Sequence, residues 1–240
     1  QLRLIRQSVE IVRKGGLIIF PTDSAYALGC HLGDKKALDK IRMIRQLSKE
    51  HNFTLMCRDL SELSLYAKID NQLYRSLKAH TPGPYTFILE GTSEVPRRLL
   101  HQKRKTIGLR IPKSQVALAL LEELGEPIMS VSLIMPGDDY PLTDPHDMRS
   151  MLEHSVDLII DGGYCGLEST TVVDFSGAYP EITRQGIGKF EDFAELFLND
   201  LSGFYCPFFA HVTSYWDKRD NPNILFLKYE EMKRDLPSVI

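Results

Sequence analysis

Short apolar runs recur along the first part of the chain and are interspersed with stretches of helical periodicity. Eight runs are predicted as strands, at residues 17–20, 53–57, 85–89, 106–110, 128–132, 158–160, 170–175 and 181–184. Amphipathic patterns predict helices before Gly15-Gly16, after Asp34, and around residues 72–78, 115–124 and 145–153. Strands and helices do not alternate strictly. The pattern therefore predicts an α/β domain with a mixed sheet rather than a doubly wound nucleotide-binding fold.

The composition changes near residue 189. Residues 1–188 hold 23 Lys and Arg against 23 Asp and Glu, whereas residues 189–240 hold 6 against 9. This last segment also carries 11 of the 22 aromatic residues and the only tryptophan, Trp216. We therefore predict two parts, residues 1–188 and 189–240, of different origin.

Several protein classes are disfavoured. The apolar runs are too short to cross a membrane, and the chain does not open with a charged segment followed by an apolar core. The four cysteines form no Cys-x-x-Cys pair, and the cysteines and histidines have no metal-ligand spacing. We expect a cytoplasmic protein that does not bind a membrane and has no metal site built from its own residues.

Hydroxyl groups and one carboxylate follow the first strand, at Thr22, Asp23 and Ser24. The carboxyl ends of strands are where ligands bind in open α/β sheets, so these residues are candidate ligand contacts. The alternative is a turn that begins at Pro21, in which Thr22 and Asp23 only satisfy backbone groups.

Other hydroxyl and guanidinium side chains stand near predicted strand ends, where they are suited to bind phosphate or carboxylate. They are Arg110, Ser130, Ser132, Thr170, Thr171 and Arg184. Arg45, at the end of the helix that follows Asp34, is expected to point to the same edge, with His51 on the loop after it. The alternative for each arginine is an ordinary surface position. The chain has no Walker loop, no Gly-x-Gly-x-x-Gly and no Gly-x-Ser-x-Gly motif.

A basic run at residues 97–105 places five positive charges in nine residues. Such a patch attracts polyphosphate or an RNA backbone. A solvated surface loop is the alternative.

These motifs, in this order, resemble the YrdC family over about residues 2–188. The family pattern of Lys/Arg-Gly-Gly, an apolar strand and Pro-Thr-Asp-Thr-x-Tyr-Gly-Leu is close to Lys14 through Leu28. Later matches are Pro82–Thr86, Ile107–Pro112, Ser169–Asp174 and Arg184–Gly186. The strings Ile44–Leu47, His51–Asp59, Val95–Leu100 and Asp161–Tyr164 resemble the YciO branch of the family.

The resemblance implies a twisted α/β fold with a positive cavity for a nucleotide or RNA. It also implies synthesis of threonylcarbamoyl-AMP from ATP, L-threonine and bicarbonate, with Mg²⁺ on the triphosphate, for modification of adenosine 37 in tRNAs. By resemblance, Thr22, Ser24 and Arg110 hold threonine or its carbamate, and Arg45 binds phosphate. Further contacts to the nucleotide or substrate are expected from Ser130, Ser132, Thr170, Thr171 and Arg184.

Two positions depart from the family pattern. The Lys-x-Arg phosphate motif becomes Arg45-Gln46-Leu47, and the Ser-x-Asn nucleotide contact becomes Ser132-Leu133-Ile134. Each departure removes a charged or amide contact. The resemblance therefore leaves two alternatives, a weak synthase and a non-catalytic module that binds double-stranded RNA or a nucleotide.

Residues 190–240 resemble a stretch of the cytosolic sulfotransferases. The matching strings are Phe190–Phe193, Phe209–Trp216 and Asn221–Lys233. The Lys-Ser-Gly-Thr-Thr-Trp loop of that family and the segment of its catalytic histidine are absent from this sequence. We expect this segment not to be an independent functional domain.

Overall fold

The computed structural model describes residues 2–48, 51, 53–177 and 180–189. Within them the helices are α1 Leu2–Arg13, α2 Lys35–Arg45, α3 Leu60–Tyr66, α4 Asn71–His80, α5 Gln115–Leu124 and α6 Pro145–Leu152. The strands are β1 Ile18–Pro21, β2 Tyr26–His31, β3 Thr54–Met56, β4 Tyr85–Glu90, β5 Thr106–Arg110, β6 Ile128–Ser132, β7 Leu158–Ile159, β8 Thr171–Asp174 and β9 Glu181–Arg184. The predictions for residues 190–240 lie outside the described residues.

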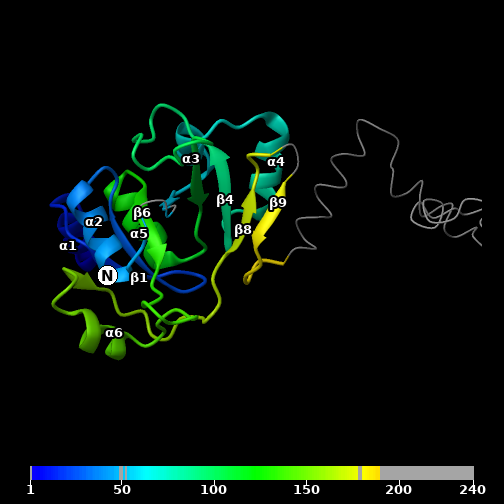
Figure 1. Ribbon diagram of the computed structural model, residues 1–240. Coiled ribbons are helices and arrows are strands. Elements are labelled where there is room, and N and C mark those ends of the chain that lie inside the picture. Colours follow the sequence, from blue (N-terminus) through cyan, green and yellow to red (C-terminus); the bar gives the residue numbers. More distant parts are fainter. Residues whose placement is uncertain (1, 49–50, 52, 178–179, 190–240) are drawn as a thin grey trace, which may run out of the picture. The chain divides into compact units, whose positions relative to one another are not determined.

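In the described part of the chain, nine strands form one sheet in the order β7-β1-β2-β6-β3-β5-β4-β8-β9. The pairs β1–β7, β3–β5 and β4–β8 are parallel, and the other neighbours are antiparallel. The predicted α/β class with a mixed sheet is confirmed (Figure 1).

The first two strands form a hairpin, which the sequence pattern does not predict. β2 pairs antiparallel with β1, Pro21 is opposite Tyr26, and residues 22–25 make the loop between them. Five of the six residues of β2 are buried. A strand that is covered on both faces shows no alternation of polar and apolar residues, so β2 lacks the usual signal.

Local signals fix the helix ends. Asp34 caps α2, because its carboxylate accepts a hydrogen bond of 2.9 Å from the N–H of Ala37. Gly15 ends the turn after α1 with φ of +83°, a conformation that glycine adopts without strain. Gln46 has a left-handed conformation directly after Arg45 and stops α2 there.

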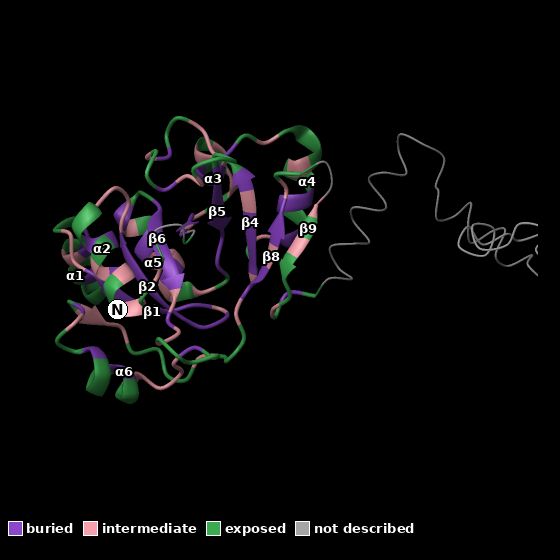
Figure 2. Ribbon diagram, in the orientation of Figure 1, coloured by how far each residue is buried: buried purple, intermediate pink, exposed green. Residues whose placement is uncertain are grey.

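Helices α1 and α5 pack together over one part of a sheet face. Val9 and Val12 of α1 and Leu120 of α5 belong to one buried cluster with Phe20 and Ile128 of the sheet. Figure 2 shows the central strands buried along their length, while the helices expose their outer surfaces. Burial of these apolar side chains is the main stabilising contribution in this region.

We predict that Leu120→Ala lowers the free energy of unfolding by about 2–5 kcal/mol, because it leaves a cavity between α5 and the sheet. Urea unfolding followed by circular dichroism measures this change. Glu122→Ala, on the same helix, is the control and should change the value by less than about 1 kcal/mol. An equal effect of both substitutions would contradict this account of the core.

Candidate functional site

The cavity lies on one face of the central strands. Thr54 of β3 is opposite both Gly108 of β5 and Ser130 of β6, so the three positions share that face. They line a cavity of about 170 Å³. A buried water needs only about 10–15 Å³, so the cavity has room for a small molecule.

The same face is apolar further along the same strands. Met56 is opposite Ile128, and both pack in the cluster beneath α1 and α5. Small and hydroxyl-bearing residues replace large apolar ones two positions away, at Thr54 and Ser130. Gly108 has no side chain, and a Cβ there would lie 3.1 Å from Oγ1 of Thr54. The change from large to small residues leaves the cavity open beside the core.

The structure brings together seven of the residues that the sequence analysis proposes for the site. The residues that line the cavity are Ser24, Arg45, Arg110, Ser130, Ser132, Thr170 and Arg184, with His51, Phe53, Thr54, Thr86, Ile88, Val172 and Ile134 among the others. Thr22 and Thr171 are not among the lining residues. The roles proposed for these side chains stay predictions.

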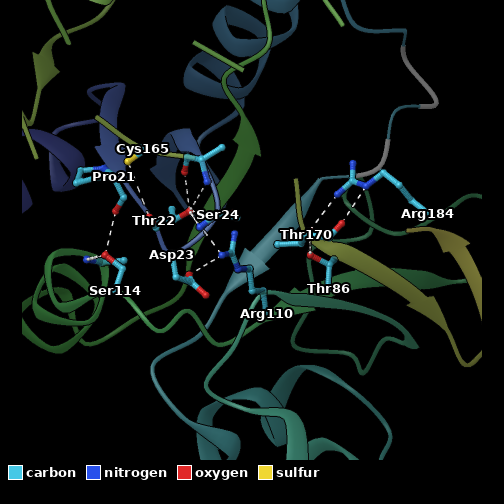
Figure 3. Close-up of polar contacts among 12 residues, drawn as sticks. Pro21, Thr22, Asp23, Ser24, Thr86, Arg110, Ser114, Cys165, Thr170 and Arg184 are labelled. Atoms are coloured by element: carbon cyan, nitrogen blue, oxygen red, sulfur yellow. Dashed lines mark hydrogen bonds and ion pairs between the residues drawn. The ribbon is translucent and has the colours of Figure 1, made fainter. Parts of the chain in front are cut away.

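Thr22 shapes the hairpin loop rather than the cavity wall. Its hydroxyl donates to the carbonyl of Ala25 at 2.6 Å and accepts from the N–H groups of Ser24 and Ala25 at 3.2 and 3.3 Å. Its Oγ1 also lies 3.2 Å from Oγ of Ser24 (Figure 3). Thr22 therefore fixes the position from which Ser24 reaches the cavity.

An ion pair joins this loop to β5. Nη2 of Arg110 lies 2.5 Å from Oδ1 of Asp23, and the two side chains are 7% and 12% exposed. The same Nη2 donates to Oγ1 of Thr22 at 3.5 Å. Burial lowers the pKa of Arg110, and the charge of Asp23 opposes that shift. The sequence analysis names Asp23 as a candidate ligand contact, whereas the family resemblance assigns it no role.

The ion pair leaves two polar atoms unused. Nε of Arg110 and Oδ2 of Asp23 are buried and have no hydrogen-bond partner among the described residues. Buried polar atoms are normally paired, so Nε of Arg110, a residue that lines the cavity, is suited to an acceptor such as a carboxylate of a bound molecule. Asp23 is not among the described lining residues.

A second polar group forms another wall of the cavity. Arg184 donates from Nε to the carbonyl of Thr170 at 3.1 Å and from Nη2 to Oγ1 of Thr170 at 3.0 Å. Oγ1 of Thr170 lies 2.8 Å from Oγ1 of Thr86. In Figure 3 this group lies apart from the hairpin loop, with Arg110 drawn between them. Thr86 is the one polar side chain between Tyr85 and Phe87, a signal that the sequence analysis did not use.

Thr171 faces away from the cavity. Its hydroxyl donates to the carbonyl of Gly188 at 2.6 Å and accepts from the N–H of Gly186 at 2.9 Å. Successive residues of a strand point to opposite faces, and Val172, the next residue of β8, lines the cavity, so Thr171 faces the other way. Thr171 instead fixes the turn after β9.

Positive charge dominates the cavity. Nε of Arg45 is buried without a partner among the described residues, and burial lowers the pKa of Arg45 and of Arg184. His51 has a lowered pKa, first through burial and then through the charges of Arg45, Arg42 and Arg184. The described residues that line the cavity include no carboxylate. The site therefore favours an anion.

The basic run at residues 97–105 is partly used for structure. Arg104 pairs with the buried carboxylate of Asp174 at 2.8 Å, and Arg98 donates to the carbonyl of Gly33. No residue of this run lines the cavity within the described part of the chain. Its attraction for RNA stays a prediction.

The two departures from the family pattern differ in location. Ile134 lines the cavity and forms a β-bridge with Pro141. Leu47 is not among the described lining residues, and its N–H donates to the carbonyl of Arg42 at 2.9 Å. The apolar side chain at 134 therefore changes the cavity wall directly.

Comparison with known proteins agrees with this architecture. The family model Sua5_yciO_yrdC, described as "Telomere recombination", matches residues 10–186. The chain belongs to this family. YciO of Escherichia coli strain K12, described as uncharacterized, is 58% identical over 80% of this chain and 94% of that protein. The crystal structure of E. coli YciO has a TM-score of 0.78 at 57% identity, with 80% of this chain and 94% of that one covered. The predicted relation to the YrdC family and its YciO branch is confirmed.

Enzymes are among the more distant relatives. A threonylcarbamoyl-AMP synthase of Pyrococcus abyssi is 30% identical over 76% of this chain and 54% of that protein. The structure of P. abyssi Sua5 complexed with L-threonine has a TM-score of 0.76 at 27% identity and covers 82% of this chain and 58% of that one. The present chain thus matches little more than half of the length of these relatives.

Two findings bear on the other expectations. A sulfotransferase-domain model matches residues 173–240, a similarity that extends the resemblance noted for the tail. Among the described residues, no helix has the length and apolar character needed to span a membrane.

We predict that Asp23→Ala lowers the free energy of unfolding by about 3–5 kcal/mol, because it leaves the buried Arg110 charge without its partner. Glu90→Ala is the matched control. It breaks the ion pair between Lys68 and Glu90, whose side chains are 63% and 53% exposed, and should cost less than about 1 kcal/mol. Denaturant unfolding of both variants tests this, and a small effect of Asp23→Ala would mean that the ion pair is not important for the fold.

Proposed function

We propose that the cavity binds ATP together with L-threonine, and that the protein is a weak threonylcarbamoyl-AMP synthase. The observation that carries the proposal is the lining of the cavity, in which Arg45, Arg110 and Arg184 meet without a carboxylate among the described lining residues. Two relatives named threonylcarbamoyl-AMP synthase are 30% and 32% identical to this chain, which supports the same ligand class.

Arg110 suits the amino acid. Threonine carries a carboxylate, and the free Nε of Arg110, which lines the cavity, matches this group in charge and hydrogen bonding. Ser24, held by Thr22, adds a hydroxyl on the same wall. These groups would orient the threonine, whose neutral amine forms a bond to the carbon of carbon dioxide and releases a proton to give the carbamate; with bicarbonate the same bond forms and water leaves.

Arg45 and Arg184 suit the phosphates. In the proposed reaction a carbamate oxygen forms a bond to the α-phosphorus of ATP, and the bond from that phosphorus to the β-phosphate bridging oxygen breaks to release pyrophosphate. Guanidinium groups stabilise the charge on the phosphate oxygens. Ser130, Ser132 and Thr170 offer hydroxyl groups to the nucleotide from the same face.

A Mg²⁺ site made by the protein does not fit the cavity. Mg²⁺ prefers carboxylate oxygens, and the described lining residues provide none. The described residues also contain no group of three or more His, Cys, Asp or Glu side chains that could hold a metal. We therefore assign the ion, if it takes part, to the phosphates of ATP and derive no step from it.

A non-catalytic module that binds double-stranded RNA or a nucleotide is the second candidate. Ile134 favours this candidate, because it lines the cavity with an apolar side chain where the family pattern has the amide of an asparagine. Under this hypothesis the same arginines bind a phosphate backbone and no pyrophosphate is released. The two candidates therefore differ in one measurable product.

We predict pyrophosphate release from ATP that requires both L-threonine and bicarbonate. Arg45→Ala should lower the rate about tenfold or more, because loss of a charged hydrogen bond removes about 1.5–3 kcal/mol and 1.36 kcal/mol is a factor of ten. Arg97→Ala, an exposed arginine of the basic run, is the control and should keep the rate. Pyrophosphate release that does not depend on threonine, or salt-sensitive RNA binding without pyrophosphate release, would support the second candidate.

We predict that Leu47→Arg combined with Ile134→Asn raises synthase activity at least tenfold, since it restores a cation and an amide to the nucleotide site. Single variants separate the two contributions, and circular dichroism checks that each variant is folded. If the rate does not change, the cavity has been adapted to another ligand.

A further inference from the structure

His51 lies among cations at the cavity. It lines the cavity with Arg45 from the end of α2 and Arg184 from the end of β9. Its ring contacts Phe53 edge-on, with 5.9 Å between the ring centres, and the backbone N–H of His51 donates to the carbonyl of Ser48 at 3.2 Å. Arg42 lies over the same Phe53 ring at 5.3 Å. The backbone and an aromatic neighbour thus hold the imidazole at the cavity.

The groups that act on His51 are all positive. Arg42 and Arg45 of α2 and Arg184 of β9 lower its pKa after burial has done so. Oδ1 of Asp39 lies 3.4 Å from Nη1 of Arg42, so the Asp39 carboxylate offsets part of the Arg42 charge. These positive neighbours favour the neutral imidazole in the ligand-free protein. A polyanion between these cations would reverse the field and favour the charged imidazole.

His51 can supply a charge that this chain lacks at Leu47. In this chain the second cation of the phosphate motif is Leu47, which is not among the described lining residues. His51 follows four residues later and does line the cavity. An imidazolium donates two hydrogen bonds and carries a charge, as a phosphate contact requires.

We propose that His51 takes up a proton from solvent when a polyphosphate binds and then acts as the second phosphate-binding cation, in place of the one that Leu47 does not supply. This inference rests on the proposed function, because it needs a polyphosphate in the same cavity. His51 forms no covalent bond and transfers no proton to the substrate. It is a binding residue whose charge appears only with the ligand.

The sign of the pH dependence follows from the two states. The pKa of His51 lies below its ordinary value of about 6.5 without ligand and rises when an anion binds. Between these two pKa values, binding takes up one proton. Affinity for the polyphosphate therefore increases as pH falls through the bound-state pKa, by up to about tenfold per pH unit, and levels off below the free-state pKa.

The test is calorimetric binding of ATP to the full chain between pH 5.5 and pH 8, in pairs of buffers with different ionisation enthalpies. The terminal phosphate of ATP also takes up protons, so the difference between variants is the measured quantity. We expect His51→Gln to take up fewer protons than the wild type when ATP binds, by up to one proton between the two pKa values, and to lose the added affinity at low pH. His51→Lys, which keeps its charge, should bind ATP at pH 8 more tightly than the wild type.

The control is His154→Gln, because the side chain of His154 is 94% exposed and is not among the described lining residues. It should match the wild type in affinity and proton uptake. If ATP binds, and binding depends on Arg45, while His51→Gln takes up as many protons as the wild type, this inference is wrong and the proposed function stands. If no variant binds ATP at any pH, the proposed function itself fails.

Discussion

The buried ion pair between Asp23 and Arg110 is the contact on which the arrangement of the cavity depends. It ties the loop of the first hairpin to a strand near the middle of the sheet, between segments that are 87 residues apart in sequence. A charge pair taken out of water is stable only if both partners stay in place. The loop therefore cannot move away without leaving Arg110 uncompensated, and Ser24 and Thr22 are held with it.

Much of the fold can be predicted from local patterns. Strands at residues 106–110, 128–132 and 181–184 and the helix at 115–124 have the predicted bounds, because alternating or periodic apolar positions mark them. β2 and the short helix α3 were not predicted. β2 is covered on both faces, and α3 has only seven residues, too few to show a period, although Asp59 and Glu62 provide a readable capping pattern.

The site is harder to predict than the fold, because the sequence identifies polar residues but does not show which way their side chains point. Thr170 and Thr171 are neighbours of one type, yet the first faces the cavity and the second does not. Thr22 belongs to the family motif, but only the hairpin geometry shows that its hydroxyl serves the loop. Thr86 is a single hydroxyl in an apolar strand, and its meaning depends on β8 lying beside β4.

The segment between β7 and β8 has a consequence for the shape of the sheet. β7 is at one edge, β8 is next to the other edge, and six strands lie between them. At about 4.8 Å per strand this is roughly 34 Å, while the 12 residue steps from Ile159 to Thr171 reach about 40 Å at most. Across a flat sheet the connection would have to run almost straight. On its way the hydroxyl of Tyr26 accepts from the N–H of Gly162 and donates to the carbonyl of Gly163. The length of this connection therefore limits how far the sheet can flatten, and a shorter connection would require a more strongly curved sheet.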